Sequence, residues 1–167
     1  TIRDIVKNSE INVFMKMVET QLEANGYTEH SYRHVGLVAK NAADILKKLG
    51  KTKREIELAE IAGFLHDIGN AVNRVDHAHN GGMIAYNFLT KLGMHVDEAA
   101  EVMLAISNHD EGSGIPVSNI SAALILADKS DVHRSRVKNR DFSTFDIHDR
   151  VNYAVVSSKI DINTESK

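Results

Sequence analysis

The 167-residue chain contains no cysteine and a single proline, and aromatic residues make up only 5% of it. The absence of cysteine rules out disulfides and thiolate metal ligands, and it fits a reducing compartment, so we expect a cytoplasmic protein. No apolar run approaches the ~18–20 residues that a membrane-spanning helix needs, and the polar start does not resemble a signal peptide. A formal net charge of −3 provides no general attraction for nucleic acid. We therefore expect neither a membrane nor a nucleic-acid partner.

The scarcity of helix breakers, together with many Ala, Leu, Ile and Val residues, favours an all-α fold. Apolar residues recur at intervals of three and four through most of the chain, which is typical of helices with one buried face. These stripes predict a bundle of six to seven helices, at about 11–22, 28–49, 52–66, 76–92, 96–109, 118–128 and 150–155.

Several of these helices have recognisable end signals. Thr52 followed by Glu55 has the pattern of a capping box, and Asp76 and Ser118 stand where an N-cap is expected. Helix ends are predicted at three glycines, Gly26, Gly50 and Gly93.

We predict one helical domain, residues 1–155, followed by a tail, residues 156–167. The tail alternates apolar and polar residues like the beginning of a β-strand. Because a lone strand is unstable, we expect the tail either to fray or to begin a C-terminal segment that this sequence does not contain.

Three predicted helices each place a histidine or an aspartate where the periodicity expects an apolar residue. His34 lies in the stripe of the second helix, the pair His66–Asp67 follows the apolar stretch GFL, and Asp128 lies within ALILADKSD. Each of these groups alone is more often a hydrogen-bonded core residue or a cap than a ligand. Burying several of them without partners would cost several kcal/mol, whereas one shared divalent cation would compensate all of them.

Taken in order, His34, His66–Asp67 and Asp128 match the H…HD…D signature of the HD-domain superfamily of metal-dependent phosphohydrolases, which this chain resembles. HDIG, beginning at His66, is the commonest local form of that signature. HVGLVA, beginning at His34, is similar to the family's first ligand helix, and LADKSD, around Asp128, resembles its last ligand segment. The resemblance spans about residues 30–135 and implies an HD-type helical bundle in which these four residues bind metal.

His30 is an alternative to His34 as the first ligand, because HSYRHV also resembles the start of the motif in some members. The two histidines are four residues apart and so share one helix face. We favour His34, since Val38 and Ala39 then fall where the family has V-A. His30 is then expected at the rim of the site as a substrate-binding residue.

Many HD proteins hold a second metal with two further histidines between the HD pair and the last aspartate. His79 in HNGG and His109 in ISNHDE match those positions in order and spacing, and His77 is the weaker candidate for the first of them. The alternative is that His79 and His109 are ordinary surface or cap residues.

The resemblance implies one or two divalent ions per chain, and ligands without sulfur suit Mn, Fe, Co, Ni, Mg or Zn. Asp67 would bridge two ions about 3.5–4 Å apart, and Asp67 and His66 would be the catalytic residues. A metal-bound hydroxide would attack the phosphorus of a phosphomonoester or phosphodiester.

A phosphorylated substrate also needs cationic partners. Residues 129–140 carry five basic side chains against one acidic side chain, and the run begins directly after Asp128. Lys129 and Arg134 are therefore candidates for binding the substrate phosphate, although charge runs of this kind are usually solvated loops.

The substrate class is less constrained than the metal site. A small phosphorylated metabolite or a nucleotide fits the pattern, whereas NHDEGSGIP only partly resembles the loop of members that open cyclic dinucleotides. Asn70, Asn108 and Ile115 depart from that subgroup. Two alternatives stay open, a di-iron oxygenase of the HD type and a nucleotide-sensing regulatory module, and so does the formation of a homo-oligomer.

Overall fold

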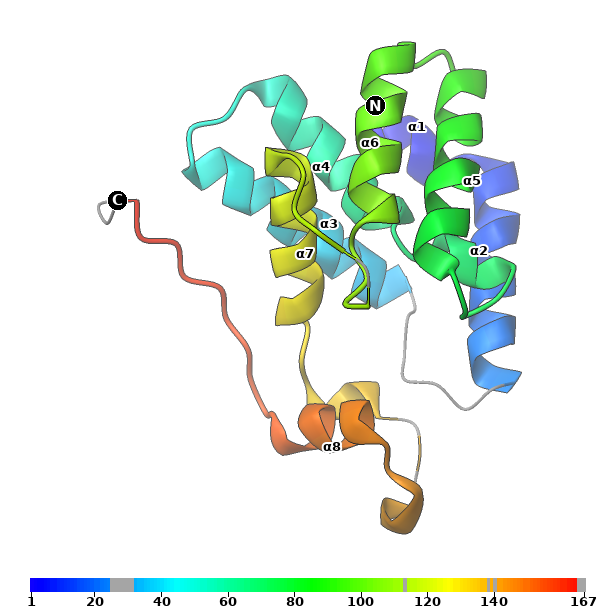
Figure 1. Ribbon diagram of the computed structural model, residues 1–167, viewed down its shortest axis with the longest axis vertical. Helices are drawn as coiled ribbons and strands as arrows, with labels where there is room; N and C mark the ends of the chain where they lie inside the picture. Colours follow the sequence, from blue (N-terminus) through cyan, green and yellow to red (C-terminus); the bar gives the residue numbers. More distant parts are fainter. Residues whose placement is uncertain (25–31, 113, 138, 140, 165–167) are drawn as a thin grey trace.

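The computed structural model describes residues 1–24, 32–112, 114–137, 139 and 141–164 (Figure 1). The all-α prediction is confirmed, and these residues contain eight α-helices rather than six or seven. They are α1 (Ile2–Val6), α2 (Ser9–Ala24), α3 (Tyr32–Lys48), α4 (Lys53–Leu65), α5 (His77–Lys91), α6 (Val96–Ser107), α7 (Asn119–Ser130) and α8 (Ile147–Ala154). Three short 3-10 helices join them, η1 (Ile68–Ala71), η2 (Arg134–Arg136) and η3 (Phe142–Thr144).

Most of the predicted helix ends are found, with one exception. Thr52 and Glu55 form the capping box of α4, and the Ser118 side chain accepts a hydrogen bond from the Ser121 amide at the start of α7. Asp76 does precede α5, but its backbone is left-handed (φ 58°) and its side chain makes no capping hydrogen bond. Gly50 and Gly93 have positive φ angles, as glycines at C-caps do, and Gly26 lies outside the described residues.

The centre of the bundle is α3, which packs along α4 and α7, while α5 packs against α6 and η1. The closest approach is between α3 and α4 at Gly63. A Cβ atom added there would lie 2.6 Å from the Cα atom of Ala39 and 2.7 Å from its amide nitrogen. His34 lies one and a half turns before Ala39 and His66 lies about one turn after Gly63, so this contact brings the two histidines together.

The C-terminal part returns to the bundle after leaving it. Figure 1 shows α8 beyond the C-terminal end of α7, from which the tail runs back in an extended conformation. Ser158 Oγ donates to the Ser130 carbonyl at 2.7 Å, and Ile160 and Ile162 pack against the core. Residues 155–164 form no strand, and the division into a domain and a tail stays a prediction.

We expect Gly63→Ala to lower the free energy of unfolding by about 1–3 kcal/mol, because its methyl group would push α3 and α4 apart. Gly36→Ala in α3 is the matched control, since an added Cβ there meets nothing within 4 Å. It should instead raise stability by about 0.5–1 kcal/mol. Urea unfolding followed by circular dichroism checks both, and equal effects of the two substitutions would contradict this account of the helix contact.

Candidate metal centre

Four predicted residues from three parts of the chain meet inside the bundle. His34 is in α3, His66 and Asp67 directly follow α4, and Asp128 is in the last turn of α7. His34 Nε2 lies 3.3 Å from His66 Nε2, 3.3 Å from Asp128 Oδ1 and 3.6 Å from Asp67 Oδ2. His66 Nε2 lies 3.3 Å from Asp67 Oδ2 and 3.6 Å from Asp128 Oδ1. Each of these two imidazole nitrogens therefore faces both carboxylates.

The outer nitrogen of each imidazole is held by an acceptor. His66 Nδ1 donates to the Gly63 carbonyl at 2.8 Å, and His109 Nδ1 donates to the Ile106 carbonyl at 2.7 Å. His34 Nδ1 lies 2.7 Å from a carboxylate oxygen of Asp131. With the proton on Nδ1, the lone pair of a neutral imidazole is on Nε2, which is how histidines are oriented in metal sites.

This arrangement attracts positive charge. Burial opposes a charged His66, but the carboxylates of Asp67 and Asp128 outweigh it and raise the pKa of His66 to about 10. Burial would raise the pKa of Asp128, yet hydrogen bonds from His34 and His66 hold it well below its usual value. Two imidazole nitrogens and two carboxylate oxygens are a ligand set that divalent Mn, Fe, Co, Ni and Zn accept. The donor chemistry therefore fits the predicted metal.

A second group adjoins the first and includes His109, as predicted. His66, Asp67 and His109 have ligand atoms within 4.8 Å of one another. The other histidine beside them is His77, whose ring lies 5.1 Å from that of His109 and whose Nε2 lies 3.8 Å from Asp67 Oδ1. Burial lowers the pKa of His77, and it lowers that of His109 to about 4, so both rings are neutral near pH 7.

His79, which we preferred on sequence, does not join this group. Its side chain is 59% exposed and lies beside Asp76 rather than Asp67. The physical reason is the helix periodicity, because residues two positions apart on a helix point to nearly opposite faces. The position expected for His79 is occupied by His77 in the structure.

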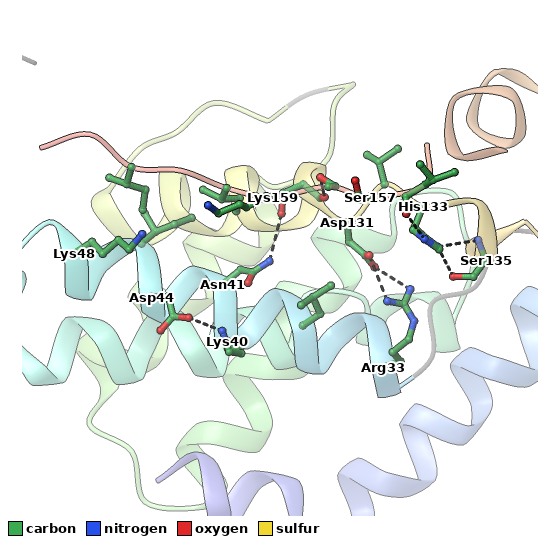
Figure 2. A pocket seen from close by; sticks show the side chains of 18 residues that line it. Arg33, Lys40, Asn41, Asp44, Lys48, Asp131, His133, Ser135, Ser157 and Lys159 are labelled. Atoms are coloured by element: carbon green, nitrogen blue, oxygen red, sulfur yellow. Dashed lines mark hydrogen bonds and ion pairs between the residues drawn. The ribbon is translucent and has the colours of Figure 1, made fainter. Parts of the chain in front are cut away.

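Three further polar residues hold the cluster in place and were not predicted. The Asn70 amide is fully buried and donates to both Asp67 Oδ1 and the Asp67 carbonyl at 3.0 Å. Asp131 accepts from His34 and from the Arg33 guanidinium at 3.1 Å (Figure 2). Asn70 and Asp131 each lie three residues after a ligand. A polar residue three positions after a candidate ligand lies about one helical turn away, and this spacing was the signal in the sequence that could have identified both residues.

Lys129 lies at the cluster, whereas Arg134 packs elsewhere. The Lys129 ammonium group is 2.9 Å from Asp128 and 3.2 Å from Glu111. Arg134 instead places its guanidinium 5.3 Å from the ring centre of Tyr153 in α8. His30 lies outside the described residues.

A cavity of about 710 Å³ opens onto the cluster. Asp67, His77, His109 and Asp128 contribute to its wall, as do residues in and just before α8. Three cations line it, Lys129, Arg74 and Arg136, and Arg74 lies 3.2 Å from His77 Nε2. The cavity has the size of a small-molecule site.

We expect His77→Ala to reduce the amount of Mn²⁺ bound per chain, because it removes a buried nitrogen beside Asp67, whereas His79→Ala should bind as the unchanged protein does. Isothermal titration and elemental analysis measure both variants. A loss of metal in His79→Ala and not in His77→Ala would restore the order first expected from the sequence.

The helix lengths and the similarity to known proteins characterise the chain further. No helix in the described part is long and apolar enough to span a membrane. A curated relative, the uncharacterized protein MJ1020 of Methanocaldococcus jannaschii, is 29% identical over 158 residues. The match covers 80% of this chain but 60% of the relative, so the chain spans about 60% of that protein's length.

The fold is shared with a solved structure, that of a predicted HD superfamily hydrolase from an uncultured Thermotogales bacterium. The TM-score is 0.59 at 24% identity, over 86% of this chain and 83% of that chain. The sequence model of the HD domain matches residues 31–138, which is more than half of the chain and includes all the clustered ligands. The chain therefore belongs to the HD domain family.

Proposed function

We propose that this HD-domain chain is a metal-dependent phosphohydrolase that hydrolyses a phosphomonoester or phosphodiester of a small metabolite or nucleotide. The observation that carries the proposal is the buried convergence of His34, His66, Asp67 and Asp128 at the wall of a cavity that also contains Lys129 and Arg74. Metal ligands and phosphate-binding cations thus face the same space.

The position of Asp67 supports two metal ions rather than one. Its Oδ2 lies 3.3 Å from His66 Nε2, on the side of His34 and Asp128, while its Oδ1 lies 3.8 Å from His77 Nε2. The two carboxylate oxygens therefore face different groups of histidines. Asn70 fixes this orientation by donating to Oδ1.

A divalent ion held by these residues supplies a coordinated water with a pKa near neutrality and withdraws charge from the phosphoryl oxygens. The chain's own residues bind and orient the substrate. Burial alone would lower the pKa of Lys129, but the charges and hydrogen bonds of Asp128 and Glu111 together outweigh burial and raise that pKa. Lys129 therefore stays a cation when a phosphate approaches. Arg74 enters the cavity from the loop before α5 and offers a planar donor group to the same phosphate.

We expect Asp67→Asn to lower kcat for p-nitrophenyl phosphate or bis(p-nitrophenyl) phosphate, assayed with Mn²⁺, by at least roughly 100-fold. The change removes the negative charge that both groups of histidines share. Asp97→Asn, on the surface at the start of α6, is the control and should keep full activity. Oxygen uptake by the iron-loaded protein without release of phosphate or nitrophenol would contradict the proposal and favour the oxygenase alternative.

Lys129→Ala should raise the KM for the better of these two substrates by about tenfold, since a charge-assisted hydrogen bond to phosphate contributes roughly 1.5–3 kcal/mol. Lys91→Ala is the matched control, because Lys91 pairs with Glu10 at the surface, away from the cavity. Steady-state kinetics at constant Mn²⁺ measure both variants. An unchanged KM in Lys129→Ala would remove Lys129 from the substrate site.

A further inference from the structure

A second hollow of about 660 Å³ lies on the outer face of α3. Figure 2 shows the tail passing over α3, with Lys48 toward one end of the groove and Arg33 with Asp131 toward the other. Asp131 and Val132 line both this groove and the cavity of the metal cluster, so the two spaces share one wall. The ligands His66, Asp67, His109 and Asp128 do not line the groove.

The base of the groove is apolar. Leu37 and Ile45 come from α3, and Ile160 and Ile162 come from the tail that closes the other side. The two isoleucines of the tail are only partly buried although they pack against the core. A ligand with an apolar body would cover the surface that they leave exposed.

The charges around this base are unequally compensated. The two carboxylates of the groove are both engaged, Asp44 by Lys40 at 2.7 Å and Asp131 by Arg33 at 3.1 Å. In the described part of the chain, the ammonium groups of Lys48 and Lys159 have no carboxylate within 4.0 Å. The groove therefore carries two cations that are not offset by carboxylates beside its apolar base.

We propose that this groove binds a small amphipathic anion, an organic carboxylate or phosphate with an apolar body, whose charged group lies at Lys48 and Lys159. The volume is within the range of small-molecule sites. Apolar contact at Leu37, Ile45 and Ile160 and charge at the two lysines together select such a ligand over a neutral one or a bare inorganic anion. This site is separate from the hydrolytic one and does not depend on what the enzyme hydrolyses.

The test uses 8-anilinonaphthalene-1-sulfonate, an amphipathic anion that fluoresces when bound. We expect saturable binding to the unchanged protein and a Kd about tenfold higher in Lys48→Glu/Lys159→Glu, because two attractive charges become repulsive. Lys16→Glu/Lys53→Glu, on exposed positions that do not line the groove, should bind as the unchanged protein does. Equal Kd values in the groove variant and the unchanged protein would overturn the proposal.

Affinity for Mn²⁺ serves as the check on folding, and it should stay within about twofold in both variants. If charge reversal disturbs the fold, the double variant Lys48→Gln/Lys159→Gln, which only removes the two charges, replaces it in the test. Its Kd for the dye should be about threefold higher than that of the unchanged protein. Weak Mn²⁺ binding by the unchanged protein would count against the proposed metal site only. The dye-binding comparison would still test the groove.

Competition identifies the ligand class. Octanoate should displace the dye, while octanol and inorganic phosphate at the same concentration should not. Octanol has the apolar body but no negative charge, and phosphate has the charge but no apolar body. Displacement by octanol to the same extent would show that the lysines do not contribute. Displacement by phosphate alone would show that the apolar base does not contribute, and either result would overturn the proposed class.

Discussion

Four buried acceptor atoms that face one another are the constraint on which the site depends. Each of the two imidazole nitrogens lies 3.3–3.6 Å from one oxygen of each carboxylate, and three of the four side chains have exposed fractions of 2% or less. Carboxylates gathered in a buried site destabilise a protein unless cations, protons or hydrogen-bond donors compensate their charge. The raised pKa of His66 expresses the same attraction for positive charge.

Close packing of the backbone allows this convergence. Gly63 lets α4 approach α3, and Gly69 lets η1 approach the start of α5, where an added Cβ would lie 1.9 Å from the His77 carbonyl. The glycine of HDIG is therefore required by the proximity of another segment. The close contact of Gly69 with the start of α5 positions His77 beside Asp67. The motif thus supplies two candidate ligands directly and places a third candidate, His77, through its glycine.

The helices and the inward position of the first four candidate ligands were predictable because both depend on local spacing. Apolar periodicity locates a helix, and a histidine or aspartate within an apolar stripe points inward. The choice between His77 and His79 was not predictable in this way, since the buried face of α5 consists largely of small residues, Ala78, Gly81, Gly82 and Ala85, which form no apolar stripe. Asn70 and Asp131 were missed because their contacts are short polar bonds that apolar periodicity does not report.

Asp131 shows why such supporting residues matter to the electrostatics. A further carboxylate beside His34 would add negative charge to a cluster that already holds two. Burial would raise its pKa, but the hydrogen bond with His34 and the charges of Arg136 and Arg33 lower that pKa to about 2. The two arginines thus offset the charge of Asp131, Arg33 at 3.1 Å and Arg136 at 3.7 Å. Asp131 can therefore orient His34 as an ionised acceptor while the charge available to a metal stays that of Asp67 and Asp128.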